Sequence, residues 1–195
     1  YVPYVQIYAI WNDRGTLADY KRELFYFKEE LSRHGSAVLL CTSAAEAEKA
    51  FAGGKAAAFL SVEGAEQLNC SEAELEKAYA EGIRAVNITW NYENALSGSN
   101  AEGNTKGLTD KGRSFVKKCN ELGVLVDVSH ISEPAFWDVM AVTQKPVLAS
   151  HSNAKAICGH SRNLTDEQYK ALVRNGGVAG INLCADFLGD APTID

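Results

Sequence analysis

The sequence lacks the features that mark several large classes of protein. Its Lys and Arg residues are scattered and the formal net charge is -6, so no clustered basic face is offered to nucleic acid. No apolar run approaches the roughly 20 residues that a membrane-spanning helix needs, and nothing at the start resembles a signal peptide. Neither GxGxxG after a strand nor GxxxxGK(S/T) occurs. We therefore expect no nucleic-acid partner, no membrane segment and no common nucleotide site.

Disulfide and zinc-ribbon patterns are also missing. The five cysteines are odd in number, widely spaced and never form a CxxC pair. This usage predicts thiols in a protein of the reducing cytoplasm. With 46% hydrophobic residues among 195, the chain has enough apolar content for one sizeable core. We expect a single domain over residues 1–195.

Short apolar runs alternate with helical patterns along the whole chain. Helix starts are marked by N-capping residues, including the capping-box pairs Ser71 with Glu74 and Thr165 with Gln168. Such alternation predicts a parallel sheet flanked by helices, with strands buried on both faces. A barrel and an open doubly wound sheet both fit this pattern. The predicted strands lie within residues 2–11, 36–41, 56–64, 84–90, 124–130, 146–152 and 178–184.

Three residues with metal-binding side chains follow predicted strands. Glu63 comes after FLSV, His130 after VDVS and His151 after VLAS. In parallel α/β folds the carboxyl ends of the strands carry the active site, and a barrel would bring these three to one mouth. Two imidazoles and a carboxylate are the protein half of a hydrolytic metal site, with positions left for water. The alternative is that each histidine is structural, but their shared position favours a metal site.

Four stretches of the chain are informative when they are taken together: GKAAAFLSVEGAEQL, EGIRAVNITWNYEN, GLTDKGRSFVKKCNELGVLVDVSH and PVLASHSNAKAICGHSRNLTDEQ. They resemble the membrane dipeptidase family, the renal dipeptidase or M19 peptidases of the amidohydrolase superfamily. The resemblance runs from about residue 44 to residue 188. It implies a zinc-dependent (β/α)8 TIM barrel that hydrolyses dipeptides with a zinc-activated water.

The resemblance also implies roles for individual residues. Glu63 falls on the carboxylate that bridges two zinc ions, and it is the candidate catalytic residue. His130 and His151 fall on the imidazole ligands of the second zinc. Arg162 falls on the arginine that binds the substrate carboxylate, a role that suits a planar guanidinium. Without the family, an ordinary surface ion pair would be the simpler interpretation of Arg162.

Three departures from the family pattern change what is expected. The His-x-Asp of the first barrel strand and the aspartate of the eighth have no counterpart in these 195 residues. The chain therefore resembles a partial barrel from strand two to strand seven, lacking the first and last strands. At most one Zn²⁺ is expected in it, where the complete family site is binuclear. Trp90 stands where better-known members have a substrate-contacting histidine, and it is either a wall for substrate side chains or a core tryptophan.

Two functions from different classes are compatible with this sequence. The first is a metal-dependent dipeptidase whose partner is a dipeptide substrate. The second is a non-catalytic barrel fragment or pseudoenzyme that binds small peptides or a partner chain, because half of the binuclear site is absent. A homodimer is left open. We also expect Asp127 to be a partner for an imidazole N–H.

Overall fold

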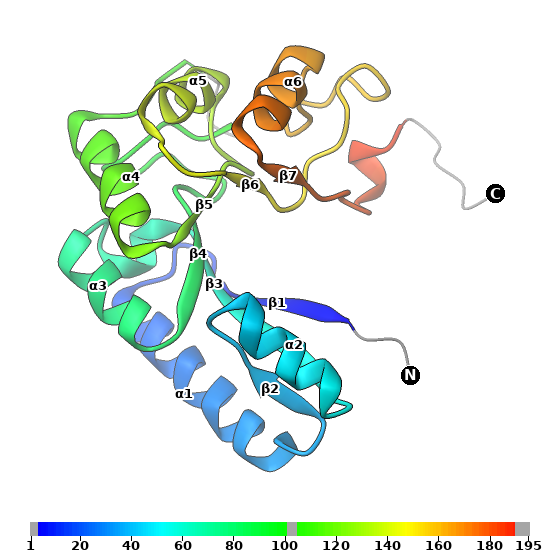
Figure 1. The fold of residues 1–195 in the computed structure, drawn as a ribbon. Coiled ribbons are helices and arrows are strands. Elements are labelled where there is room, and N and C mark those ends of the chain that lie inside the picture. The colour runs from blue at the N-terminus through cyan, green and yellow to red at the C-terminus, as the bar shows by residue number, and fades with distance from the viewer. Residues whose placement is uncertain (1–3, 101–104, 190–195) are drawn as a thin grey trace. The chain divides into compact units, whose positions relative to one another are not determined.

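Helices and strands alternate in this computed structural model, which describes residues 4–100 and 105–189 (Figure 1). The chain divides into two compact units. Unit 1 comprises residues 1–86 and 122–124, and unit 2 comprises residues 87–121 and 125–195. The strands are β1 (Val5–Ile10), β2 (Val38–Leu40), β3 (Ala56–Glu63), β4 (Ile83–Asn87), β5 (Leu125–Asp127), β6 (Leu148–Ala149) and β7 (Val178–Ala179). The α-helices are α1 (Leu17–His34), α2 (Ala44–Ala52), α3 (Glu72–Ala80), α4 (Asp110–Leu122), α5 (Glu133–Val142) and α6 (Asp166–Asn175), with short 3-10 turns η1 (Ala65–Leu68) and η3 (Ala185–Phe187).

The sheet of unit 1 is parallel and is organised around β3. Strand β1 pairs with β3 from Val5 opposite Ala57 to Ile10 opposite Val62, and β2 pairs with the beginning of β3. The side chains of β3 alternate little in burial, because α2 packs against the strand as well as its neighbours. A small core cluster of Cys41, Ala47, Ala50 and Ala57 fills the contact between α2 and β3. This packing holds the beginning of β3, and Glu63 is the last residue of the strand.

Unit 2 contains a second run of parallel strands, in the order β5, β6 and β7. Asp127 lies opposite Leu148, and Leu148 lies opposite Val178. Helices α5 and α6 contact each other, and α6 returns the chain to β7. The core of unit 2 includes Phe115, Phe136 and Leu172, all at most 2% exposed. The strands of this unit are two or three residues long, so the turns that follow them are fixed mainly by side-chain hydrogen bonds.

Two sequence predictions about the strands are wrong. The predicted strands 124–130 and 146–152 are too long, since β5 ends at Asp127 and β6 at Ala149. Their histidines therefore lie in the turns after the strands. Burial on both faces holds for β3 but not for β1, whose Val5, Ile7 and Tyr8 are exposed. Strand β1 lies at the end of the strand order in unit 1, where fewer neighbours cover it.

The cysteines and the helices can be compared with what the sequence predicts of disulfides and membrane segments. All five cysteines carry thiols. Across residues 4–100 and 105–189, no helix combines the length and the apolar character needed to cross a membrane. Nothing in the fold tests the expectation of one domain over residues 1–195, which stays a prediction.

Candidate metal centre

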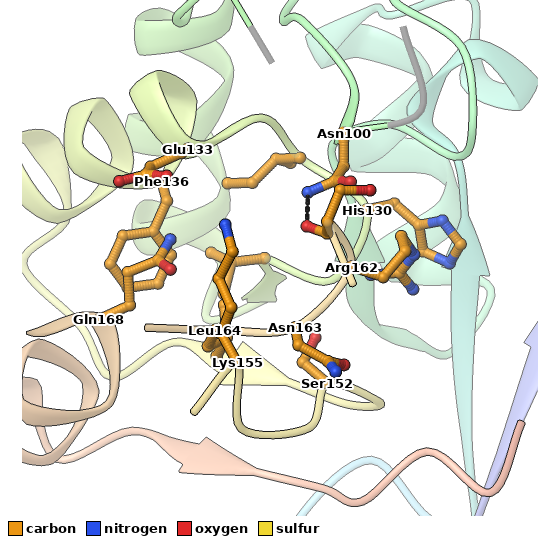
Figure 2. Close-up of a pocket in the computed structure, with 13 residues that line it drawn as sticks. Asn100, His130, Glu133, Phe136, Ser152, Lys155, Arg162, Asn163, Leu164 and Gln168 are labelled. Atoms are coloured by element: carbon orange, nitrogen blue, oxygen red, sulfur yellow. Dashed lines mark hydrogen bonds between the residues drawn. The ribbon is translucent and has the colours of Figure 1, made fainter. Parts of the chain in front are cut away.

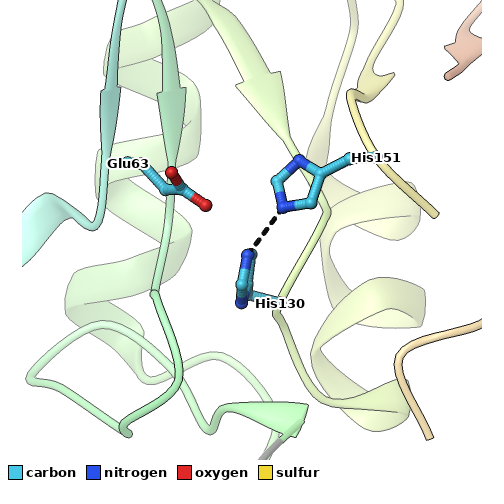
Figure 3. A group of neighbouring side chains, drawn as sticks. All are labelled: Glu63, His130 and His151. Atoms are coloured by element: carbon cyan, nitrogen blue, oxygen red, sulfur yellow. Dashed lines mark hydrogen bonds between the residues drawn. The ribbon is translucent and has the colours of Figure 1, made fainter. Parts of the chain in front are cut away.

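The imidazoles of His130 and His151 meet in unit 2 (Figure 3). Their Nε2 atoms are 2.7 Å apart, and the ring centroids are 4.8 Å apart with the planes at 62°. His130 is 7% exposed and His151 is half-buried. Two histidines from the turns after β5 and β6 thus direct the same ring nitrogen toward one point. The structure thus brings together two of the three candidate metal ligands.

The other nitrogen of each ring faces a side-chain oxygen. His130 Nδ1 lies 2.8 Å from Asn91 Oδ1, and His151 Nδ1 lies 2.6 Å from Ser150 Oγ. An amide oxygen accepts only, so the Asn91 contact places the proton of a neutral His130 on Nδ1. The Nε2 lone pair is then directed toward His151. This orientation by an outer partner is how metal-ligating histidines are generally held.

His130 has a backbone conformation that side chains rarely adopt. Its φ is 77°, in the left-handed region that costs most residues other than glycine about 1 kcal/mol or more. Three donors hold its carbonyl oxygen in place. They are the N–H of Asn100 at 2.8 Å and the hydroxyls of Ser99 at 3.3 Å and Thr89 at 3.4 Å. Strain held by its surroundings in this way is typical of functional sites.

A buried carboxylate lies behind the two imidazoles. Asp127 is 3% exposed, and its Oδ1 accepts the backbone N–H of Ser129 at 2.9 Å and of Ser150 at 3.1 Å. Burial raises the pKa of Asp127 above its ordinary 3.8, and hydrogen bonds from the Ser150 side chain and the two N–H groups partly offset that rise. The prediction that Asp127 is the direct partner of an imidazole N–H is wrong. Asn91 and Ser150 are the partners of the two Nδ1 atoms, and Asp127 Oδ1 accepts backbone N–H groups instead.

Glu63 belongs to unit 1 and ends β3. Its side chain is half-buried, and its backbone carbonyl accepts a hydrogen bond from Gln67 Nε2 at 3.0 Å. The same amide nitrogen donates to the carbonyl of Ile10 at 3.1 Å, at the end of β1. Gln67 is itself fully buried. One amide thus holds the carboxyl ends of two neighbouring strands, and it fixes the backbone that carries Glu63.

Arg162 is buried in unit 2, at 6% exposure, so the interpretation as a surface ion pair is wrong. Figure 2 shows it with His130 among the side chains around a cavity of about 10 Å³, the room of one water molecule. Its guanidinium carbon lies 5.7 Å from the centre of the Phe187 ring. Asn100 hydrogen-bonds Ser161, the residue before Arg162, and donates its own N–H to His130. Asn100 therefore links the loop that carries Arg162 to the turn that carries His130.

Trp90 lies beside the imidazole pair. Its ring centroid is 6.2 Å from that of His130 and 5.6 Å from that of Tyr92, in an edge-on arrangement. The residue is half-buried. Four of the five predicted site residues, Trp90, His130, His151 and Arg162, thus belong to unit 2. Sequence reasoning did not assign roles to Asn91, Ser150 or Asn100; Asn91 and Ser150 each adjoin a candidate in the sequence, and Asn100 gave no signal.

Comparison with known proteins identifies the family of this chain. The sequence model of the membrane dipeptidase family, peptidase family M19, matches residues 13–195. The chain belongs to this family. It is 35% identical over 165 residues to an uncharacterized protein in the PQQ-III 3' region of Acinetobacter calcoaceticus, covering 82% of this chain and 52% of that protein. It is 38% identical over 151 residues to an uncharacterized dipeptidase of Schizosaccharomyces pombe, covering 73% of this chain and 36% of that protein.

Two solved structures of metallo-peptidases share the fold. Dipeptidase AC, a metallo-peptidase of family M19, superposes with a TM-score of 0.86 at 25% identity, over 94% of this chain and 60% of that one. A metallo-peptidase from Rhodobacter sphaeroides, bound to a phosphinate mimic of L-Ala-D-Ala, gives 0.80 at 27% identity, over 89% and 50%. The predicted fold class, an incomplete (β/α)8 barrel, is confirmed. The chain spans 50% and 60% of the lengths of these two metallo-peptidases and 52% of the Acinetobacter relative.

The buried carboxylate gives this M19 chain a testable pH dependence. The folded state binds the Asp127 proton more tightly than the unfolded chain does, because the pKa is raised. The free energy of unfolding should therefore fall as pH rises from 3.8 through the raised pKa. Asp127→Asn removes this titration. Its unfolding free energy relative to the wild type should increase with pH, as measured by urea unfolding between about pH 4 and about pH 8.

A carboxylate with the opposite shift provides the control. Hydrogen bonds from Thr16 lower the pKa of Asp19 to about 2, so its stabilising effect is lost only as pH falls below 3.8. Asp19→Asn should differ from the wild type by a constant amount above that pH. A constant difference for Asp127→Asn as well would contradict the raised pKa of Asp127.

Proposed function

We propose that this M19 protein is a zinc-dependent dipeptidase in which Glu63, His130 and His151 bind one metal ion. The observation that carries the proposal is the imidazole pair, with its Nε2 atoms 2.7 Å apart and each Nδ1 facing a side-chain oxygen. Two nitrogens on one tetrahedral zinc lie about 3.3 Å apart, given Zn–N distances of about 2.0–2.1 Å. A separation of the rings by about 0.6 Å would therefore fit the ion.

Glu63 is proposed as the third ligand because of its place at a strand end. It terminates β3, and the two histidines follow β5 and β6 in the same parallel fold. In (β/α)8 barrels, the carboxyl ends of all strands form one mouth, which is where catalytic residues gather. Two imidazoles and one carboxylate, with water as the fourth ligand, form a common catalytic zinc set. The donor set fits zinc, and Glu63 is also the proposed catalytic carboxylate.

The chemistry required is hydrolysis of a peptide bond. A zinc ion bound by these ligands supplies Lewis acidity to a water molecule and to the scissile carbonyl. The chain's own residues orient the imidazoles, through Asn91 and Ser150, and keep them in the ligating tautomer. The buried surroundings of His130 limit water around the site, which strengthens the electrostatic interactions within it. The M19 neighbours that are dipeptidases or bind a dipeptide mimic support this substrate class.

Arg162 is proposed to bind the substrate's C-terminal carboxylate. Its guanidinium is buried, and its loop is joined to the histidine turn through Asn100. A buried guanidinium can bind a carboxylate with two parallel hydrogen bonds, which a Lys ammonium cannot reproduce. Trp90, with its ring beside His130, is proposed as an apolar wall for a substrate side chain. Cytoplasmic location and a homodimer stay predictions.

The metal-binding set can be tested by single substitutions. The purified 195-residue chain should bind at most one zinc ion, and weakly, and His130→Asn, His151→Asn and Glu63→Gln should each weaken that binding further by about 100-fold or more, because each removes one of three protein ligands. Isothermal titration with Zn²⁺ measures the affinity. His34→Asn is the control, since His34 lies at the exposed end of α1. Wild-type affinity in Glu63→Gln would remove Glu63 from the proposed set.

The role of Arg162 can be tested with two forms of one substrate. In a full-length enzyme, Arg162→Lys should raise KM for L-Ala-D-Ala by about 10-fold or more, because a bidentate contact to the carboxylate is lost. The same dipeptide amidated at its C-terminus has no carboxylate, so its kinetics should change little. Equal losses on both substrates would show that Arg162 is structural. Metal binding without hydrolysis of either form would favour the non-catalytic peptide-binding alternative.

A further inference from the structure

The carboxylate of Asp127 connects the two turns that carry the histidines. One oxygen, Oδ1, accepts the N–H of Ser129, one residue before His130, and the N–H of Ser150, one residue before His151. The turns belong to different strands, β5 and β6, which pair at Asp127 and Leu148. These two hydrogen bonds lie just beyond the backbone pairing of β5 with β6. They set how far apart the two turns lie.

A second set of contacts strengthens this connection. The hydroxyl of Ser129 accepts the N–H of His151 at 3.1 Å, and its carbonyl accepts a hydrogen bond from the side chain of Asn87 at 3.2 Å. Ser129 is fully buried, as is Ser152, whose hydroxyl is 3.4 Å away. Water therefore does not compete for these groups, and the backbone of each turn has few alternative arrangements.

A hydroxyl next to this carboxylate reaches one imidazole. The N–H of Ser150 is bonded to Asp127, and the Ser150 hydroxyl oxygen lies 2.6 Å from His151 Nδ1 and 3.5 Å from the hydroxyl oxygen of Ser129. A serine hydroxyl has one proton. Since that proton is donated to Ser129 Oγ, Ser150 Oγ accepts from His151 Nδ1–H, and the Nε2 lone pair of His151 is directed toward His130. Both rings then present a lone pair to the same point, which is the arrangement a cation needs.

We propose that Asp127 is a positioning residue for the metal centre, which holds the two histidine turns together and, through the N–H of Ser150, places the hydroxyl that faces His151 Nδ1. The inference rests on the proposed function of the imidazole pair as metal ligands. It assigns Asp127 no contact with the substrate or the metal. Outer partners that orient ligating histidines typically change metal affinity by about 10- to 100-fold when they are removed.

Two substitutions separate the two effects of Asp127. Asp127→Ala removes both, and Ser150→Ala removes the hydroxyl while it leaves the Ser150 N–H bonded to Asp127. Each should weaken zinc binding by about 10- to 100-fold. Asp127→Asn keeps an acceptor oxygen for the two N–H groups, so it should bind zinc more tightly than Asp127→Ala. Isothermal titration with Zn²⁺ on the purified protein measures all three affinities.

Amide hydrogen exchange in the absence of metal gives an independent measurement. The backbone N–H groups at positions 129 and 150 should lose protection from exchange in Asp127→Ala and keep it in Ser150→Ala. Asp138→Ala is the matched control, because Asp138 also accepts a backbone N–H, from Leu108, and pairs with Arg113. It should reduce stability and leave zinc affinity unchanged.

The outcomes separate this inference from the proposed function. Wild-type zinc affinity in folded Asp127→Ala or in Ser150→Ala would overturn the positioning role and leave the metal centre in place. A loss of affinity in Asp138→Ala equal to that in Asp127→Ala would also overturn it, since any destabilisation would then have the same effect. Absence of zinc binding by the wild type would instead overturn the proposed function.

Discussion

Two imidazole nitrogens in contact impose the strictest constraint on this chain. His130 and His151 direct Nε2 atoms to within 2.7 Å of each other. Two lone pairs at this distance repel, so the arrangement needs a proton or a cation between them and needs both turns held against separation. The left-handed backbone of His130, the three donors on its carbonyl and the shared carboxylate of Asp127 all serve that need. The surrounding polar network is explained by the same constraint.

Sequence patterns predicted those parts of the molecule that depend on local chemistry. The capping box at Thr165 and Gln168 forms in full, with bonds of 3.2 and 2.9 Å. The box at Ser71 forms only in part, because the Glu74 carboxylate pairs with Lys77. Helix starts and the alternation of strands and helices followed from such signals. The positions of the histidines after strands followed from the apolar runs that precede them.

The missed features depend on contacts between residues far apart in the sequence. The apolar run VLVDVSH continues a strand pattern, yet β5 ends at Asp127 because that side chain accepts the Ser129 and Ser150 N–H groups. Periodicity contains no information about such a bond. Asn91 is 39 residues from His130, and its role as the partner of Nδ1 required the fold. The burial of Arg162 likewise depends on the packing of unit 2, where the sequence alone permitted a surface ion pair.

The central claim is that the imidazole pair and a carboxylate bind zinc, and X-ray absorption at the zinc edge tests it most directly. Protein with one equivalent of zinc should show only nitrogen and oxygen neighbours at about 2.0–2.1 Å, with the outer scattering of two imidazoles. The five cysteine thiols are the competing ligands in this chain. A sulfur neighbour at about 2.3 Å, or scattering without imidazole, would contradict the account.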